Sequence, residues 1–261
     1  MFALLWLLLL AYAGLTALHA CVPDIGRPPA LARREGRAPG RAPALFFTLP
    51  AGFMLGVIPF TSLAYFIAWL SNIISPEGVY PLLPASIVSA LLALAATILI
   101  GRSYGFPGAG LFSGARQGGT RRTTAFYAAV CLVFLLLGLG LSWYSFRRFG
   151  SLTGAGFSVF SDFGPHTALV SSFAKGRNFP ASYPHFTGDG IRYHFFFYFL
   201  CGNLHYLGLP IDWAINLPSL LGSISFASIL GWMAVRWSGR HSTFLIAPLL
   251  LIGRSSTAIF H

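Results

Sequence analysis

The chain has little charge, and very little of that charge is negative. Charged residues make up 9% of the 261 residues, with six acids in all and a single lysine, Lys175. A water-soluble domain carries about a quarter charged residues, so the composition excludes an ordinary soluble domain. Hydrophobic residues instead make up 56% of the chain, and the mean hydropathy is +0.71. This is the composition of a membrane protein.

The sequence also lacks a cysteine framework and a strand pattern. Cys21, Cys131 and Cys201 are far apart and form no CxxC motif, so no disulfide scaffold is indicated. No regular ten-residue segments of alternating polarity are present, which argues against a β-barrel. Several apolar runs reach the roughly 20 residues that a helix needs to cross the hydrocarbon layer. We therefore predict an all-α fold, a polytopic transmembrane helical bundle.

The net charge of +11 comes almost wholly from arginine, much of it in two linkers, 21–43 and 101–124. Positive linkers beside membrane spans indicate the cytoplasmic side, so no nucleic-acid partner is predicted. This places the N-terminus outside, and it also places the long loop 146–213 on the outer face. We expect an integral protein of a bacterial plasma membrane.

Two regions follow from the order of the apolar runs. Region 1–124 contains three spans joined by basic cytoplasmic linkers. Region 125–261 contains a span, the large outer loop 146–213 with juxtamembrane helices, a span at 214–235 and the start of another span. The full set of predicted spans is 2–20, 44–70, 82–100, 125–144 and 214–235, whereas 193–209 is too short to cross and is read as an interfacial helix. We expect the chain to be the N-terminal part of a longer protein.

Titratable residues gather in one stretch of the outer loop, 161–194. Pro165 suits the first turn of a helix that ends near Lys175, which makes Gly164 the cap and leaves Asp162 two residues too early. Asp162 is then either held in an Asx-turn or serves as a general base or metal ligand. Further along, His185 and Asp189 lie in a tract rich in turn-forming residues.

The cations of this stretch have two readings. Lys175, Arg177 and Arg192 either attract anionic lipid headgroups or bind a phosphate or pyrophosphate, for which the arginine fork is suited. A separate pattern places His194, Tyr198, Cys201 and His205 on one face of a helix. This face is either a metal site or a polar stripe against protein or headgroups.

From residue 125 onward the chain resembles the GT-C superfamily of integral-membrane glycosyltransferases, in particular the dolichyl-phosphate-mannose and ArnT-like branch. Asp162 with His166 stands at the position of the acid of that family's outer loop, and the sequence RNFPASYP resembles the passage before its second juxtamembrane helix. The residues AINLPS, 214–219, resemble an A-x-R-L-P-S motif, with Asn216 in place of the arginine. Arg192, Tyr193 and His194 stand where a proline-rich motif is often found.

The resemblance implies transfer of a hexose or pentose from a polyprenyl-phosphate carrier to an acceptor on the outer face, with Asp162 and His166 as catalytic residues. The implied substrate-binding residues are Lys175, Arg177, His185, Asp189, Arg192, Tyr193 and His194. The partners are a polyprenyl-phosphate-linked sugar and membrane lipids. A single acid stands where an acidic pair is common, so a divalent cation is left open as a cofactor.

Two other functions fit the same residues. A transporter or flippase for an anionic lipid or solute would use Lys175, Arg177 and Arg192 as binding groups. However, the full spans contain no acid or base near the midplane, where transport sites usually place one. A non-catalytic subunit of a membrane assembly is the other alternative.

Overall fold

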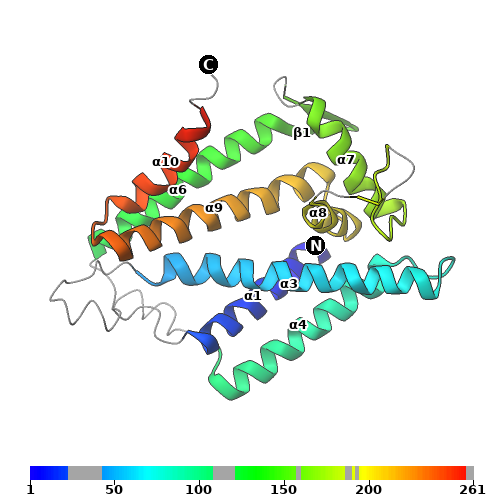
Figure 1. The fold of residues 1–261 in the computed structure, drawn as a ribbon, viewed down its shortest axis with the longest axis horizontal. Helices are drawn as coiled ribbons and strands as arrows, with labels where there is room; N and C mark the ends of the chain where they lie inside the picture. Colours follow the sequence, from blue (N-terminus) through cyan, green and yellow to red (C-terminus); the bar gives the residue numbers. More distant parts are fainter. Residues whose placement is uncertain (23–42, 108–120, 157–159, 186–189, 192–193, 257–261) are drawn as a thin grey trace.

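The computed structural model describes residues 1–22, 43–107, 121–156, 160–185, 190–191 and 194–256. This part of the chain is mostly helical, with one small sheet (Figure 1). The helices are α1 (Phe2–Cys21), α3 (Leu45–Ile74), α4 (Leu82–Tyr104), α6 (Arg121–Ser145), α7 (Phe160–Lys175), α8 (Phe196–Tyr206), α9 (Ile211–Ser238) and α10 (Thr243–Ser256). The strands are β1 (Phe146–Phe149) and β2 (Leu152–Ala155).

Five of the described helices are long and apolar enough to cross a membrane: α1, α3, α4, α6 and α9. They match the five predicted spans and extend a few residues beyond most of the predicted limits. With 11 residues, α8 is too short to cross, as expected for 193–209. The apolar part of α10, Thr243–Ile252, is also shorter than a span. The fold is therefore that expected of a helical, multi-pass membrane protein.

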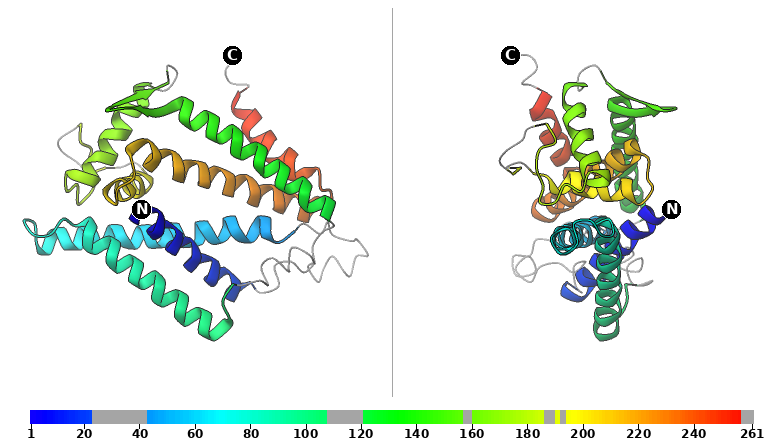
Figure 2. Two further views of the ribbon diagram at one scale, coloured as in Figure 1. Left: turned by 180° about the vertical axis from the view of Figure 1, so that it is seen from behind. Right: turned by 90° about the vertical axis from the view of Figure 1, so that its right-hand side faces the viewer.

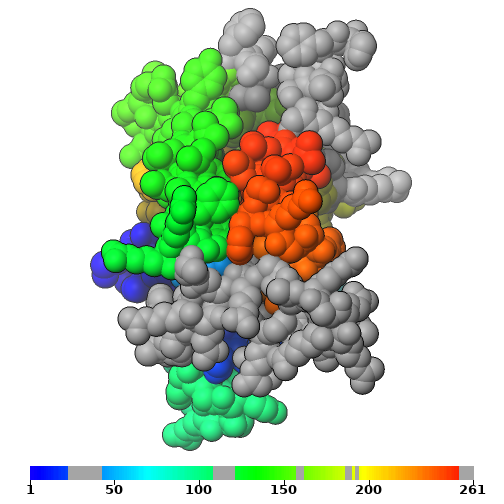
Figure 3. Space-filling model, turned by 90° about the vertical axis from the view of Figure 1, so that its left-hand side faces the viewer, coloured from blue at the N-terminus to red at the C-terminus, as the bar shows by residue number. Residues whose placement is uncertain are grey.

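The long helices form two groups that meet at α3 and α9 (Figures 1 and 2). One group contains α1, α3 and α4, and the other contains α6, α9 and α10. In Figure 3, α10 (orange to red) lies beside α6 (green). The helices α7 and α8 and the hairpin β1–β2 gather at one end of the bundle, which we call the loop end. This end corresponds to the predicted outer face.

Glycines allow α1 and α3 to cross with their backbones in contact. A Cβ atom on Gly56 would overlap the carbonyl oxygen of Leu10, and one on Gly14 would overlap the backbone of Gly56. Small residues at such crossings are typical of helices that associate in lipid, where close van der Waals packing drives association.

The hairpin β1–β2 was not predicted. Its strands are antiparallel, with Phe146 opposite Ala155 and Phe149 opposite Leu152. A two-residue turn joins them, and its first residue, Gly150, has a φ of 59°, a conformation that favours glycine. Gly followed by Ser between two short runs is a recognised hairpin signal, so the sequence did contain the information.

Replacing Gly56 with alanine is expected to destabilise the protein, because the new methyl group would push α1 away from α3. Overpacking of this kind typically costs about 1–3 kcal/mol. The matched control is Gly140→Ala on α6, where an added Cβ meets no atom within 4 Å. This variant should have an unchanged or slightly higher stability. Thermal unfolding of both variants in detergent tests this, and equal melting temperatures would contradict it.

Candidate functional site

Asp162 and His166 line one pocket at the loop end. They are four residues apart on α7 and therefore share a face of the helix. The pocket has a volume of about 190 Å³, and its other lining residues are Pro165, Leu169, Tyr183 and Tyr198. The Asp162 side chain is exposed, and His166 is half-buried. A carboxylate and an imidazole thus face the same small cavity, as proton transfer to a bound ligand would require.

The helix that carries this pair begins earlier than predicted. It starts at Phe160, so Pro165 lies inside the helix and Asp162 lies in the first turn. The prediction of Gly164 as the cap and of Asp162 outside the helix is therefore wrong. Two residues after Pro165, the Thr167 hydroxyl donates to the carbonyl oxygens of Phe163 at 2.6 Å and Gly164 at 3.0 Å. A carboxylate in a first turn also interacts favourably with the helix dipole.

The environment of His166 favours the neutral imidazole. Partial burial lowers its pKa below the ordinary value, and the nearby His194 lowers it further, while the Asp162 carboxylate acts in the opposite direction. Burial is the largest of these effects. His166 is accordingly suited to accept a hydrogen bond or a proton rather than to act as a fixed cation.

His194 joins the pair through Tyr198. The rings of His166 and Tyr198 have centroids 4.9 Å apart, and those of His194 and Tyr198 are stacked at 6.1 Å. The structure therefore brings three of the predicted site residues, Asp162, His166 and His194, together around one buried tyrosine.

Two predicted phosphate-binding cations lie at the far end of α7. Lys175 is 13 residues beyond Asp162, which corresponds to about 20 Å along a helix. Arg177 donates to the carbonyl oxygens of Pro76 and Gly78 and lies over the ring of Tyr80, 5.4 Å from its centroid. The Arg177 guanidinium thus holds the loop 75–81 in place, and neither cation is beside the pocket.

Side chains of α3 and the adjoining loop fix the segment that follows α7. The Asn72 amide donates to the Phe179 carbonyl at 2.8 Å, and the Tyr65 hydroxyl accepts from the Ala181 N–H at 3.0 Å. The Tyr80 hydroxyl donates to the Phe173 carbonyl at 2.9 Å and accepts from the Arg177 N–H at 3.1 Å. Burial raises the pKa of Tyr80, so it remains a phenol able to donate.

The remaining predicted residues are less informative. His185 is exposed, while Asp189, Arg192 and Tyr193 lie outside the described residues. The predicted helical face of His194, Tyr198, Cys201 and His205 is wrong in one respect, because α8 begins at Phe196, after His194. Within α8, Cys201 is fully buried, and His205 Nδ1 bonds the Leu209 carbonyl at 2.8 Å.

The sequence interpretation missed the residues that attach the hairpin to the bundle. Asp212 is buried in the first turn of α9 and accepts a hydrogen bond from the Arg148 N–H at 3.2 Å. One turn later, the Asn216 amide donates to the Phe146 carbonyl at 2.7 Å. The signal available in the sequence was an acid two residues after Gly-Leu-Pro, at the start of a long apolar run.

The hairpin carries two further arginines, and Phe146 of its first strand contacts the neighbour of Asp162. The ring of Phe146 stacks on that of Phe163, the neighbour of Asp162, with centroids 4.7 Å apart. Arg147 and Arg148 follow Phe146 and are exposed.

The described residues of the site supply few metal ligands. Among the residues whose positions the structure gives, no group of three or more His, Cys, Asp or Glu side chains could hold a metal ion. Asp162 and His166 supply two donors, fewer than the three protein ligands usual at a catalytic zinc site. We therefore assign no chemical step to a metal.

Comparisons with known proteins found no matching family model, no matching curated protein and no matching solved structure.

The neighbours of His166 predict how its pKa responds to substitution. Asp162→Asn should lower the pKa of His166, because it removes the negative charge that favours imidazolium. His194→Gln should raise the pKa, because it removes a like charge. An NMR titration of the His166 ring in detergent micelles measures both shifts, and shifts of the same sign in the two variants would contradict the assigned contacts.

Tyr80→Phe is expected to loosen the segment after α7. The substitution leaves the Arg177 N–H and the Phe173 carbonyl without their partner, at a cost of about 1–3 kcal/mol. Hydrogen exchange of residues 173–182 should increase, whereas Tyr104→Phe, at an exposed tyrosine of α4, should have no effect. Unchanged exchange in the Tyr80 variant would show that the phenol does not hold this segment.

Proposed function

We propose that the protein is a membrane glycosyltransferase that moves a sugar from a polyprenyl-phosphate carrier to an acceptor on the outer face. The observation that carries the proposal is the pocket shared by Asp162 and His166 at the loop end of a helical membrane bundle. The resemblance of residues 125–261 to GT-C enzymes supports the same function.

In the proposed reaction Asp162 is the general base. The acceptor hydroxyl attacks the anomeric carbon of the sugar, and the Asp162 carboxylate takes its proton. The bond between the anomeric carbon and the phosphate oxygen breaks, and the carrier phosphate leaves with the electron pair. His166, kept neutral by its surroundings, accepts a hydrogen bond from the sugar or acceptor and orients it.

In this proposal the arginines of the hairpin stabilise the departing phosphate, although the Arg147 guanidinium lies over the Phe149 ring, 4.5 Å from its centroid. Arg147 and Arg148 belong to the strand whose Phe146 stacks on Phe163, whereas Lys175 lies about 20 Å along α7. Cations near a leaving phosphate stabilise the charge that develops there. In this proposal Arg147 and Arg148 take the role that the resemblance implied for Lys175 and Arg177.

A transporter function has less support. The buried polar side chains described in α1, α3 and α4 are hydroxyls only: Thr16, Thr48, Thr61, Ser86, Ser89 and Thr97. The one buried acid described, Asp212, lies in the first turn of α9 and bonds the hairpin. A transport site at the midplane usually includes an ionisable group or an unwound helix.

The test measures transfer of labelled sugar from polyprenyl phosphate in membranes that contain the protein. Asp162→Asn should reduce kcat by about 10²–10⁴-fold, which is the usual contribution of a general base. Arg147→Gln with Arg148→Gln should lower kcat and kcat/KM for the lipid donor, because it removes charge stabilisation of the departing phosphate, and Lys175→Gln should change them little.

Glu77→Gln is the matched control, because Glu77 is another exposed carboxylate at the loop end. It should retain full turnover. Wild-type membranes without transfer would contradict the proposed function, while transfer that survives Asp162→Asn would remove Asp162 from the mechanism.

A further inference from the structure

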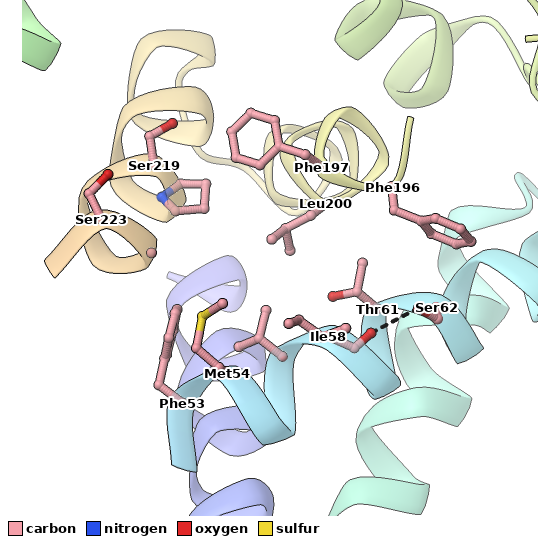
Figure 4. A pocket seen from close by; sticks show the side chains of 13 residues that line it. Phe53, Met54, Ile58, Thr61, Ser62, Phe196, Phe197, Leu200, Ser219 and Ser223 are labelled. Carbon is pink, nitrogen blue, oxygen red and sulfur yellow. Dashed lines mark hydrogen bonds between the residues drawn. The ribbon is translucent and has the colours of Figure 1, made fainter. Parts of the chain in front are cut away.

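A second cavity lies on the opposite side of α8 from the Asp162 pocket. It is an apolar crevice of about 380 Å³ between α3, α8 and α9 (Figure 4). Phe53, Val57 and Ile58 of α3 face Phe197 and Leu200 of α8 across it, with Gly222 of α9 at its side. Tyr198, which lines the Asp162 pocket, points to the other side of α8.

One polar group in the crevice has no partner. The Thr61 side chain is only 4% exposed, and its hydroxyl forms no hydrogen bond in the described structure. In Figure 4 its oxygen points toward the space under Leu200. The neighbouring hydroxyls of Ser62 and Ser219 donate instead to carbonyls of their own helices, at 3.0 and 2.8 Å. A buried donor without a partner is costly, so Thr61 calls for an acceptor from outside the chain.

The depth of the crevice follows from the length of α3. Thr61 is 16 residues after Leu45, or about 24 Å along the helix, within a hydrocarbon layer of about 30 Å. One turn further, the Tyr65 hydroxyl already accepts from the Ala181 N–H of the loop end. With the opposite boundary of the hydrocarbon layer placed at Leu45, Thr61 lies just below the boundary on the side of the loop end, at the level where the chains of a lipid join its headgroup.

The lining identifies the chemistry of the occupant. Among the described residues that line the crevice, none carries a charge, so a phosphate at this depth would have no counter-ion. An ester carbonyl, by contrast, needs a single neutral donor, and the apolar walls suit the hydrocarbon chain attached to it. Acyl esters of glycerolipids present this combination at this depth.

We propose that the crevice binds one acyl chain of a glycerolipid, whose ester carbonyl accepts a hydrogen bond from Thr61. The site is separate from the Asp162 pocket and does not depend on the proposed transferase activity. It makes the lipid a component that fills the space between α3 and α9 beside α8.

The first test fills the crevice. A Cβ atom on Gly222 meets no atom within 4 Å, so Gly222→Phe can place its ring in the crevice. The matched control is Gly140→Phe on α6, where a Cβ is equally free and which does not line this crevice. Native mass spectrometry of protein reconstituted with phosphatidylcholine should show one retained lipid for wild type and for Gly140→Phe, and none for Gly222→Phe.

The second test distinguishes the contribution of the ester carbonyl to lipid binding from that of the acyl chain. Wild type should retain ester-linked phosphatidylcholine about fivefold more strongly than the ether-linked analogue, as expected for one hydrogen bond. Thr61→Val should remove this preference, and Thr61→Ser should restore it. Circular dichroism of each variant confirms that the helices are intact.

Two outcomes would overturn the proposal. One is equal lipid retention by Gly222→Phe and wild type. The other is displacement of the retained phosphatidylcholine by polyprenyl phosphate at an equimolar ratio, which would assign the crevice to the isoprenoid chain instead.

Discussion

Aromatic packing around Tyr65 and Phe199 joins the loop end to the membrane helices. Phe199 of α8 contacts Tyr65 of α3 and Phe173 of α7 edge-on, with centroids 5.3 and 5.6 Å apart. Edge-on aromatic pairs contribute beyond their buried area. At Gly202 a Cβ would meet the Cβ of Phe173 at 2.7 Å, so α7 and α8 also approach closely. The position of Asp162 depends on this packing, because α7 touches the bundle largely through α8.

Much of the fold could be predicted from composition and length alone. Apolar runs of about 20 residues between polar linkers can only be helices in a membrane, and all five predicted spans are present as helices. The short length of 193–209 likewise predicted that α8 would not cross. These features depend on the lipid bilayer, which constrains the length and polarity of each segment independently of the others. They can therefore be predicted from the sequence.

The candidate site was harder to predict because it depends on contacts between distant segments. Asp162 and His166 share a face of α7, which their spacing of four already implied. The sequence alone could not decide whether Lys175 and Arg177 attract anionic headgroups or bind a phosphate. The carbonyls that Arg177 bonds lie about 100 residues earlier in the chain, so this contact could not be foreseen. Asp212 looked like an ordinary polar residue at a helix start, and its burial appears only when the hairpin covers it.

The short helix α8 separates two compartments with opposite chemistry. Tyr198 faces a pocket with a carboxylate and an imidazole, and Leu200, two residues later, faces an apolar crevice. A ligand that shifts α8 from one side alters the shape available on the other. By thermodynamic linkage such an influence would run equally in both directions, so a lipid bound in the crevice and a ligand bound in the polar pocket would affect one another through α8.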